Sequence, residues 1–263
     1  MDLGLEGKVA LVTAASKGLG KAIAMELASE GCNVAICARN KDGLQEAAAD
    51  IKKATGADIL TFKTDVTSLK QLEALVTTVE EKHKRIDILL SNAGGPPLGT
   101  FDKLDLSDFK WAVELNLLST INLCRMVVPG MKKRKWGRII NLTSISAKQP
   151  LDNLMLSNTA RAGVLGFSKT LSTEVAPNRI TVNCICPGYT LTDRLKSFAK
   201  DLSKSSKVSV GQIYNSWQRA IPANRLAEPE EVAHLAAFLA SEKAAYITGT
   251  SIQIDGGFIK GLY

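Results

Sequence analysis

Small residues follow a short apolar run near the start of the chain, and this arrangement suits the binding of a phosphate. Residues 9–12 form an apolar run typical of a buried strand, residues 14–20 are small and flexible, and residues 23–28 resume a helical apolar period. A helix that begins after such a turn presents unpaired backbone N–H groups and the positive end of its dipole. The segment therefore predicts a nucleotide-binding turn.

The charges after the second apolar run indicate which nucleotide is bound. An acidic side chain at this place usually holds the ribose hydroxyls of NAD. Here Arg39 and Asn40 occupy it, and Lys17 lies in the turn, so two cations and no carboxylate are expected near the ribose. Cations make charge-assisted hydrogen bonds to a 2′-phosphate, and arginine can make two in parallel. We expect NADP(H) as the cofactor; the alternative is that both cations are ordinary surface charges.

Apolar runs and helical patterns alternate along the whole chain. The expected strands are 9–12, 33–37, 59–63, 86–91, 137–143, 180–186 and 251–254, and the expected helices are 18–30, 41–55, 67–84, 102–132, 153–176 and 229–241. Such alternation predicts a parallel sheet with helices on both faces and ligands at the carboxyl ends of its strands. We expect one α/β domain over residues 1–263, a doubly wound Rossmann-type fold with about seven strands.

Residues 191–224 are the one long stretch without a regular pattern. They are rich in Lys and Ser and are expected to contain short helices. A loop of this length in a compact domain often covers a substrate, so we expect a lid here; disorder is the alternative.

Composition excludes several classes of protein. A chain of 263 residues, 45% of them apolar, can bury one large core, and none of its apolar runs is long enough to span a membrane. The start carries acidic residues and no secretory signal, and the five cysteines form no disulfide framework, so a cytoplasmic protein with reduced thiols is expected. Cys184 and Cys186 lack a second Cys or His pair, and we expect no metal site. The formal charge of +7 is scattered and accompanied by few aromatic residues, which argues against nucleic acid as a partner.

Several separate stretches resemble the short-chain dehydrogenase/reductase family. The turn over residues 13–20 is similar to the family pattern T-G-x-x-x-G-x-G, and residues 91–94 are similar to its N-N-A-G strand end. Further matches are Asn116, Pro187-Gly188, residues 247–249 and residues 255–257. The resemblance covers essentially the whole chain, in order and with the family's spacing, and within it the chain looks similar to 3-oxoacyl-carrier-protein reductases.

The resemblance implies a set of cofactor-binding residues: Thr13, Ala15, Ser16, Lys17, Gly18, Leu19, Gly20, Arg39, Asn40, Asp65, Val66, Asn92, Ala93, Gly94, Pro187, Gly188 and Thr190. Two positions depart from the family pattern, because Ala14 replaces its first glycine and Ser91 its first asparagine. Alanine is expected to preserve the turn if this position does not require a positive φ. Ser91 keeps a side chain that forms hydrogen bonds.

The resemblance also implies a catalytic set of Asn, Ser, Tyr and Lys, in which the Tyr moves the substrate proton. Asn116 and Ser144 match the first two, but Ser157 stands at the tyrosine position and Arg161 at the lysine position. A serine hydroxyl has a far higher pKa than a phenol, so it is a poor proton donor near neutral pH. Arginine stays protonated, so Arg161 is expected to hold ribose hydroxyls or a substrate anion rather than relay a proton. Four-residue spacing keeps Ser157 and Arg161 on one helix face.

The group that replaces the tyrosine as proton donor is left open by the sequence. Tyr189 lies beside Pro187-Gly188, Tyr214 lies in the expected lid, and Lys148 follows the strand-five loop. A water molecule positioned by Ser144 and Ser157 is a further option. The two histidines, His83 and His234, are expected to lie far from the site.

Two functions from different classes remain. The first is an NADPH-dependent carbonyl reductase or alcohol dehydrogenase acting on a small molecule, with a carrier-bound substrate or a sugar as options. The second, motivated by the loss of both Tyr and Lys, is a cofactor-binding protein with little or no activity. For a carrier-bound substrate, Lys135 and Arg179 are the cations that would engage an acidic carrier protein. Val113, Leu117, Ile121, Cys124 and Val128 form an apolar stripe on one expected helix. The family resemblance implies that such helices pair between subunits in a homotetramer; burial within the monomer is the alternative.

Overall fold

The computed structural model describes residues 1–262, apart from the side chain of Ser205; residue 263, the last of the predicted domain, lies outside the described residues. Within them, seven parallel strands form one sheet in the order β3-β2-β1-β4-β5-β6-β7. The strands are β1 (Val9–Val12), β2 (Asn33–Ala38), β3 (Leu60–Lys63), β4 (Ile88–Ser91), β5 (Gly137–Leu142), β6 (Ile180–Pro187) and β7 (Ser251–Ile254). The predicted doubly wound α/β fold is confirmed.

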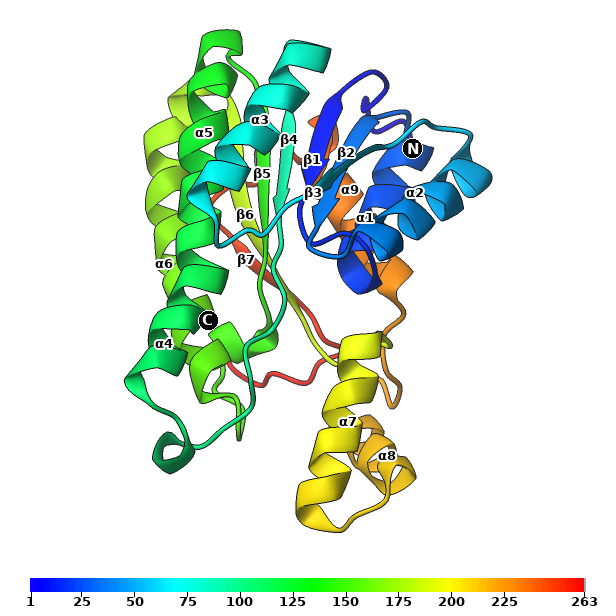
Figure 1. Ribbon diagram of the computed structural model, residues 1–263, viewed down its shortest axis with the longest axis vertical. Coiled ribbons are helices and arrows are strands. Elements are labelled where there is room, and N and C mark those ends of the chain that lie inside the picture. The colour runs from blue at the N-terminus through cyan, green and yellow to red at the C-terminus, as the bar shows by residue number, and fades with distance from the viewer. Residues whose placement is uncertain (263) are drawn as a thin grey trace.

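Helices cover both faces of the sheet, as Figure 1 shows. One layer contains α1 (Gly18–Ser29), α2 (Lys41–Thr55) and α9 (Pro229–Ala240), and the other contains α3 (Leu69–His83), α5 (Ser119–Arg134) and α6 (Met155–Val175). Ala10 and Val12 of β1 pack in the first core, whereas Val9 and Leu11 pack in the second. Successive strand residues point to opposite faces, so two buried faces require an unbroken apolar run.

The predicted helix over residues 102–132 begins later and is not uniform. Asp105 caps α4 (Leu106–Val113), because its carboxylate accepts hydrogen bonds from the backbone N–H groups of Ser107 at 2.7 Å and Asp108 at 3.1 Å. A π-helical turn over Glu114–Leu118 then joins α4 to α5. Of the predicted apolar stripe, Cys124 and Val128 are buried within this subunit, and the other three residues are half-buried.

Residues 191–224 are more regular than the sequence predicted. They contain α7 (Asp193–Ser206) and α8 (Val210–Ala220), which Figure 1 shows protruding beyond the sheet edge at which β6 ends. Thr192 and Ser209 cap the two helices through their hydroxyl groups. Apolar side chains from both helices form a separate cluster: Leu195, Ala199, Ile213, Trp217, Ile221 and Leu226. The pair therefore has a small core of its own.

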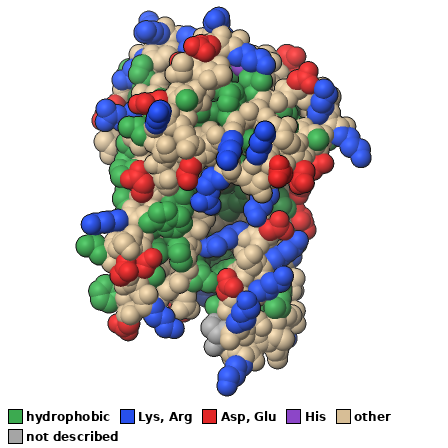
Figure 2. Space-filling view, in the orientation of Figure 1, with side chains coloured by type: hydrophobic (Ala, Val, Ile, Leu, Met, Phe, Trp, Pro, Cys, Tyr) green, Lys and Arg blue, Asp and Glu red, His purple; other side chains and the backbone are tan. Residues whose placement is uncertain are grey.

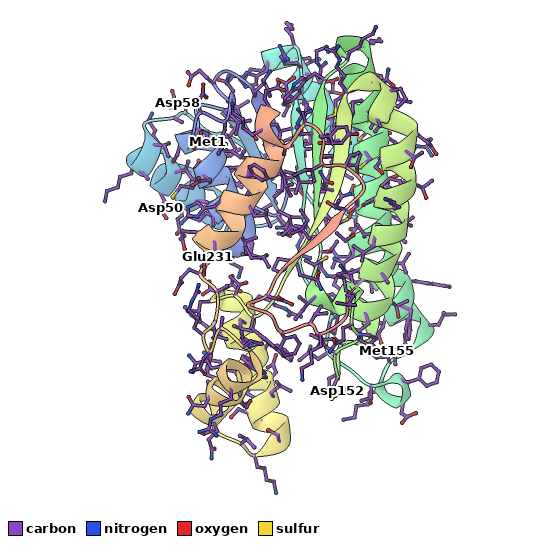
Figure 3. All side chains as sticks on the ribbon, turned by 180° about the vertical axis from the view of Figure 1, so that it is seen from behind. Met1, Asp50, Asp58, Asp152, Met155 and Glu231 are labelled. Atoms are coloured by element: carbon purple, nitrogen blue, oxygen red, sulfur yellow. The ribbon has the colours of Figure 1, made fainter. Side chains whose placement is uncertain are left out.

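An ion pair ties the end of this helical pair to the main body. Arg225 donates from Nη1 and Nη2 to the two carboxylate oxygens of Glu231, at 2.6 and 2.7 Å. These hydrogen bonds lower the pKa of the Glu231 carboxyl group to about 2. Figure 3 shows Glu231 at the start of α9, where that helix meets the protruding pair.

Burial governs the chemistry of the cysteines. All five are free and buried. Burial raises the pKa of the Cys32, Cys37 and Cys184 thiols to about 12 and also raises the pKa of Cys124 and Cys186. Within residues 1–262, no three or more His, Cys, Asp or Glu residues group as metal ligands would, and no helix is long and apolar enough to cross a bilayer.

We therefore expect the native protein to resist thiol reagents. The thiolate is the reactive form, and both burial and the raised pKa suppress it. Titration with a chromogenic disulfide at mildly alkaline pH should detect almost no thiol in the native protein and all five after unfolding in denaturant. Rapid stoichiometric labelling of a native thiol would contradict this burial.

Candidate active site

The loops after β1 and β4 are held together by one threonine. The Thr13 hydroxyl donates to the backbone carbonyl of Asn92 at 2.7 Å and accepts from the backbone N–H of Asn92 at 2.8 Å. The Asn92 side chain in turn donates to the backbone carbonyl of Ala14 at 3.3 Å. Since β1 and β4 are neighbours in the sheet, these bonds fix the glycine-rich turn against the segment over residues 92–94.

The turn itself requires two backbone features. Ala14 has a φ of +49°, so the condition under which alanine was expected to be harmless is not met, and the residue is held in the left-handed region. At Gly20, an added Cβ would lie 2.6 Å from the Ala14 carbonyl oxygen and 2.9 Å from Asn92 Nδ2. Only glycine allows α1 to pass so close to the turn.

The start of α1 is open to a ligand. Lys17 occupies the N-cap position without a side-chain hydrogen bond to the helix, so the first N–H groups of α1 are unsatisfied. Leu19 and Ser16 are half-buried in the same turn, and Ala15 is fully buried, with its N–H bonded to the Cys37 carbonyl at 3.0 Å. This geometry fits a pyrophosphate at the helix end.

The two predicted cations flank neighbouring elements of the fold: Lys17 directly precedes α1, and Arg39 directly follows β2. Arg39 and Lys17 are both exposed, and neither forms an ion pair with a described residue. Asn40 caps α2 by accepting from the N–H groups of Asp42 and Gly43, at 3.0 and 3.4 Å. An added Cβ at Gly43 would lie 3.8 Å from Ser16, so the start of α2 lies beside the turn. Arg39 is thus positioned next to the nucleotide-binding turn.

The other predicted cofactor residues lie at the same sheet edge. The Asp65 carboxylate accepts from Thr67 within its own loop, and Val66 is buried. Gly188 passes so close to β7 that an added Cβ would lie 2.8 Å from the Asp255 Cα. Beyond Pro187 and Gly188, the Thr190 hydroxyl donates to the Gly188 carbonyl at 3.2 Å.

The start of α7 reaches the glycine-rich turn. A Cβ added to Gly18, which has a φ of +57°, would lie 3.6 Å from the Thr192 side chain. The segment after β6 therefore closes one side of the space above α1.

Asn116 lies in the π-helical turn and is buried. Its side-chain amide donates to the Gly94 carbonyl at 3.0 Å, while its Oδ1 atom is buried with no partner among the described residues. Its backbone carbonyl accepts from Thr120, whose hydroxyl is 2.9 Å from the Ser91 hydroxyl. Ser91, one of the two departures from the family pattern, therefore helps to hold this turn, and π-helical turns are frequent at functional sites.

The serines after β5 form a short chain of hydrogen bonds. The Ser144 hydroxyl accepts from the Ser146 N–H at 3.1 Å, and the hydroxyls of Ser146 and Ser157 are 3.1 Å apart. Ser157 and Ser146 are buried and Ser144 is half-buried. The structure therefore brings Ser144 and Ser157 together through Ser146, a residue that sequence reasoning missed because nothing in the pattern marks it.

Arg161 lies one helical turn beyond Ser157. Its Nη1 atom donates to the carbonyls of Leu142 and Thr143, both at 3.1 Å, which directs the guanidinium to the end of β5. Only 9% of the residue is exposed, and no described carboxylate pairs with it. Burial, together with the charge of Arg194, lowers the pKa of Arg161 to about 10, so the side chain is still protonated at neutral pH.

The other candidate proton donors pack against or bond to residues outside this chain of serines. Tyr189 stacks on Trp217 at a ring distance of 4.9 Å, and burial raises the pKa of its phenol. Tyr214 packs edge-on against the same tryptophan. The Lys148 amine donates to the Ser251 carbonyl at 3.1 Å and to the Gln253 side chain at 3.2 Å, both on β7.

Comparison with known proteins gives concordant matches. Residues 13–259 match the family described as enoyl-(acyl carrier protein) reductase. L-sorbose reductase from Gluconobacter frateurii, solved with NADPH and L-sorbose, has a TM-score of 0.94 and 38% identity, and the match covers 100% of both chains. The NADPH-dependent reductase BacG of Bacillus subtilis is 33% identical over 97% of this chain and 99% of its own length. The 3-oxoacyl-(acyl-carrier-protein) reductase FabG of Chlamydia trachomatis is 34% identical over 96% and 98%.

We expect opposite effects from two substitutions in the glycine-rich turn. Gly20→Ala forces a Cβ against backbone and should lower the free energy of unfolding by about 1–3 kcal/mol and abolish nucleotide binding. Ala14→Gly removes the strain of a left-handed alanine, roughly 1–2 kcal/mol, but glycine loses more conformational entropy on folding, which costs roughly 0.5–1 kcal/mol. The substitution should therefore raise the free energy of unfolding by about 0.5–1 kcal/mol.

Denaturant titrations of the two variants, with nucleotide binding followed by fluorescence, measure both effects. If Gly20→Ala were neutral in stability and binding, the close approach of α1 to the turn would be wrong.

Proposed function

The chain belongs to the short-chain dehydrogenase/reductase family, and on that basis we propose that it is an NADPH-dependent oxidoreductase that interconverts a carbonyl group and an alcohol. The observation that carries the proposal is the link between the two halves of the site. Thr13 and Asn92 join the nucleotide-binding turn to the β4 loop, and Asn116 is bonded to that loop at Gly94. Nucleotide and substrate positions are thus held by one continuous set of hydrogen bonds.

The residues present fit an NADP(H) cofactor. The uncapped start of α1 suits the pyrophosphate, and the unpaired cations Arg39 and Lys17 suit a 2′-phosphate. The orphaned Oδ1 atom of Asn116 offers an acceptor to a bound group or water. When bound, the cofactor supplies or takes the hydride, and the protein supplies orientation and electrostatics.

Each polar side chain has a defined task in this proposal. Ser144 donates a hydrogen bond to the substrate carbonyl and orients it. Arg161, protonated and buried, holds ribose hydroxyls or stabilises negative charge that develops on the substrate oxygen. Asn116 keeps the β4 loop and the π-helical turn in place. Ser146 and Ser157 hold the Ser144 loop against α6.

The proton comes from water in this proposal. Ser157 is bonded to Ser146 and Lys148 to β7, and no hydrogen bond among the described residues joins either of them, or Tyr189, to Ser144. A water molecule at Ser144 that exchanges with solvent gives a proton to the alkoxide oxygen and regains one from solvent, so no hydroxide is left in the site.

Residues 191–224 act as the substrate lid of this site. The start of α7 lies against the glycine-rich turn, and the separate core of α7 and α8 allows them to move as one unit. The proposed assembly is a homotetramer paired through α4, α5 and α6, and Trp111 and Leu118 on α4 and in the π-helical turn are 40% and 37% exposed. The proposed location is the cytoplasm.

A carrier-bound substrate and a small free substrate place different demands on the site. Lys135 and Arg179 directly precede β5 and β6, at the sheet edge opposite Ser144. A carrier protein bound there would lie at the other end of the sheet from Ser144. A small ketone or sugar, as in the sorbose reductase relative, requires no such arrangement.

A cofactor-binding protein with little activity is the second candidate. It is favoured by Ser157, which occupies the tyrosine position with its hydroxyl bonded to Ser146. The test below separates the two functions.

We expect Ser144→Ala to reduce kcat by about 100-fold or more, because it removes the hydroxyl donor that we propose binds the carbonyl oxygen. NADPH affinity should change less than about twofold, since the hydroxyl does not belong to the nucleotide-binding turn. The assay follows NADPH oxidation with 3-oxoacyl thioesters, diketones and sugar-derived ketones. NADPH binding without turnover of any ketone, in the wild type as in the variant, would favour the cofactor-binding protein.

We expect Arg39→Gln to weaken NADPH binding by about 10- to 100-fold, as the loss of a charge-assisted bond to the 2′-phosphate predicts. NADH affinity should be nearly unchanged, because NADH has no phosphate there. Fluorescence titration with both nucleotides measures the ratio, and Lys133→Gln, an exposed residue near the end of α5, serves as a charge-matched control. Equal wild-type affinity for NADPH and NADH would contradict this assignment.

A further inference from the structure

Two arginines near the proposed substrate position have no acidic partner. Arg161 and Arg194 come from different elements, α6 and α7, and neither forms an ion pair with a residue among 1–262. The nearest acid in sequence, Asp193, has a carboxylate oxygen 3.6 Å from the Lys196 amine instead. The site therefore carries two positive charges that no described side chain neutralises.

Arg194 lies on the loop that Asn116 holds. Its Nη2 atom donates to the Pro96 carbonyl at 2.8 Å. The guanidinium also lies flat against Gly95, where an added Cβ would be 2.9 Å from Nη2 and 3.0 Å from Nε. Because Gly94 accepts from Asn116 in the same loop, Arg194 extends the proposed substrate site into the lid.

Arg161 approaches from the neighbouring loop. Strands β4 and β5 are paired, with Ser91 opposite Asn141, so the loops that follow them lie side by side. Arg161 uses only Nη1 in hydrogen bonds to described residues, at Leu142 and Thr143, and its remaining donors are free. After burial, the positive charge of Arg194 is the next cause of the lowered pKa of Arg161, because a nearby cation disfavours the protonated form.

The arrangement costs free energy until an anion binds. Arg161 is buried without an acidic partner, which is costly for a cation, and Arg194 brings a second positive charge to the exposed side of the same site. Figure 2 shows the molecule hollowed between the sheet body and the protruding helices, with Lys or Arg side chains at the rim of the hollow. An anion in this space would offset both charges at once.

We propose that the substrate is an oxo acid whose carboxylate is held between Arg161 and Arg194. This rests on the proposed function and specifies its substrate class. In the reduction, the hydride of NADPH forms the new C–H bond, the C=O π pair moves to oxygen, and a proton from water completes the hydroxyl group. The carboxylate is unchanged, so the product is a hydroxy acid that still carries its negative charge.

The arginines also explain why the lid contributes a cation. Guanidinium groups bind a carboxylate through two parallel N–H donors, and here one guanidinium comes from α6 and the other from α7. A bound carboxylate would add a further link between the lid and the body beside the Arg194–Pro96 hydrogen bond, and a neutral ketone would not.

The test measures binding of oxamate, a non-reducible analogue of a 2-oxo acid, to the protein saturated with NADP⁺, by calorimetry. Oxamide is the neutral counterpart. We expect oxamate to bind and oxamide to bind at least about tenfold more weakly. Arg194→Gln should weaken oxamate binding about tenfold or more while leaving NADPH affinity unchanged, and the loss of the Pro96 hydrogen bond should lower the melting temperature by only about a few degrees. Lys200→Gln removes an equal charge from the exposed side of α7 and should leave oxamate binding unchanged.

Three results overturn the proposal: no oxamate binding to the wild-type complex, equal binding of oxamate and oxamide, or an equal loss of oxamate and NADPH affinity in Arg194→Gln. The last result would make Arg194 a cofactor ligand. A phosphorylated ketone bound in preference to oxamate would assign the cations to a phosphate and would also overturn it.

Turnover separates failure of this inference from failure of the proposed function. If 2-oxo acids and their methyl esters are reduced equally well, the oxidoreductase stands and the oxo-acid assignment is wrong. If oxamate binds as expected but no carbonyl compound of either kind is reduced, the anion site stands and the oxidoreductase is wrong.

Discussion

The reciprocal hydrogen bonds between Thr13 and Asn92 are the interaction on which the site depends. They lock the loops after two neighbouring strands into one rigid unit. The Asn92 amide, which bonds to the Ala14 carbonyl, then leaves so little space that only glycine fits at position 20. From this unit the contacts extend through Gly94 to Asn116 and through Gly95 to Arg194. The proposed positions of the nucleotide, the substrate and the lid therefore all depend on this unit, which lies at the edge of the sheet where the strands end.

A serine and an arginine at the positions where the family resemblance implies a phenol and an amine would change the electrostatics of the proposed site more than its shape. Ser157 is absorbed into the hydrogen bonds of the β5 loop, where it supports Ser144 through Ser146. Arg161 keeps the positive charge of the lysine position but spreads it over a larger group bonded to the end of β5. The site has lost a titratable acid near neutral pH and has kept a permanent cation. Such a site favours the binding of negative charge over proton transfer by a side chain.

Much of the fold was predictable because the sheet is parallel and covered on both faces. Each strand must then be a short, unbroken apolar run, and the runs at residues 9–12 and 251–254 coincide with β1 and β7. The boundary of α4 was missed because it depends on the Asp105 cap. Short helices were expected within residues 191–224, but the bounds of α7 and α8 were not predicted, because their apolar residues are sparse and pack mainly against each other and against Tyr189 and Phe258.

The sequence by itself predicted a glycine-rich turn that suits a nucleotide, the order of the strands and helices along the chain, and Asn116, Ser144, Ser157 and Arg161 as candidate site residues. These features depend on residue type and short separations, which periodicity and motif carry. Only the tertiary structure decided that Ala14 takes a positive φ, that Ser146 joins Ser144 to Ser157, and that Arg194 reaches the β4 loop. The positive φ and the Arg194 contact depend on segments far apart in the chain that the sheet brings together at one edge. The Ser146 link depends on how α6 packs against the β5 loop, which no local pattern records.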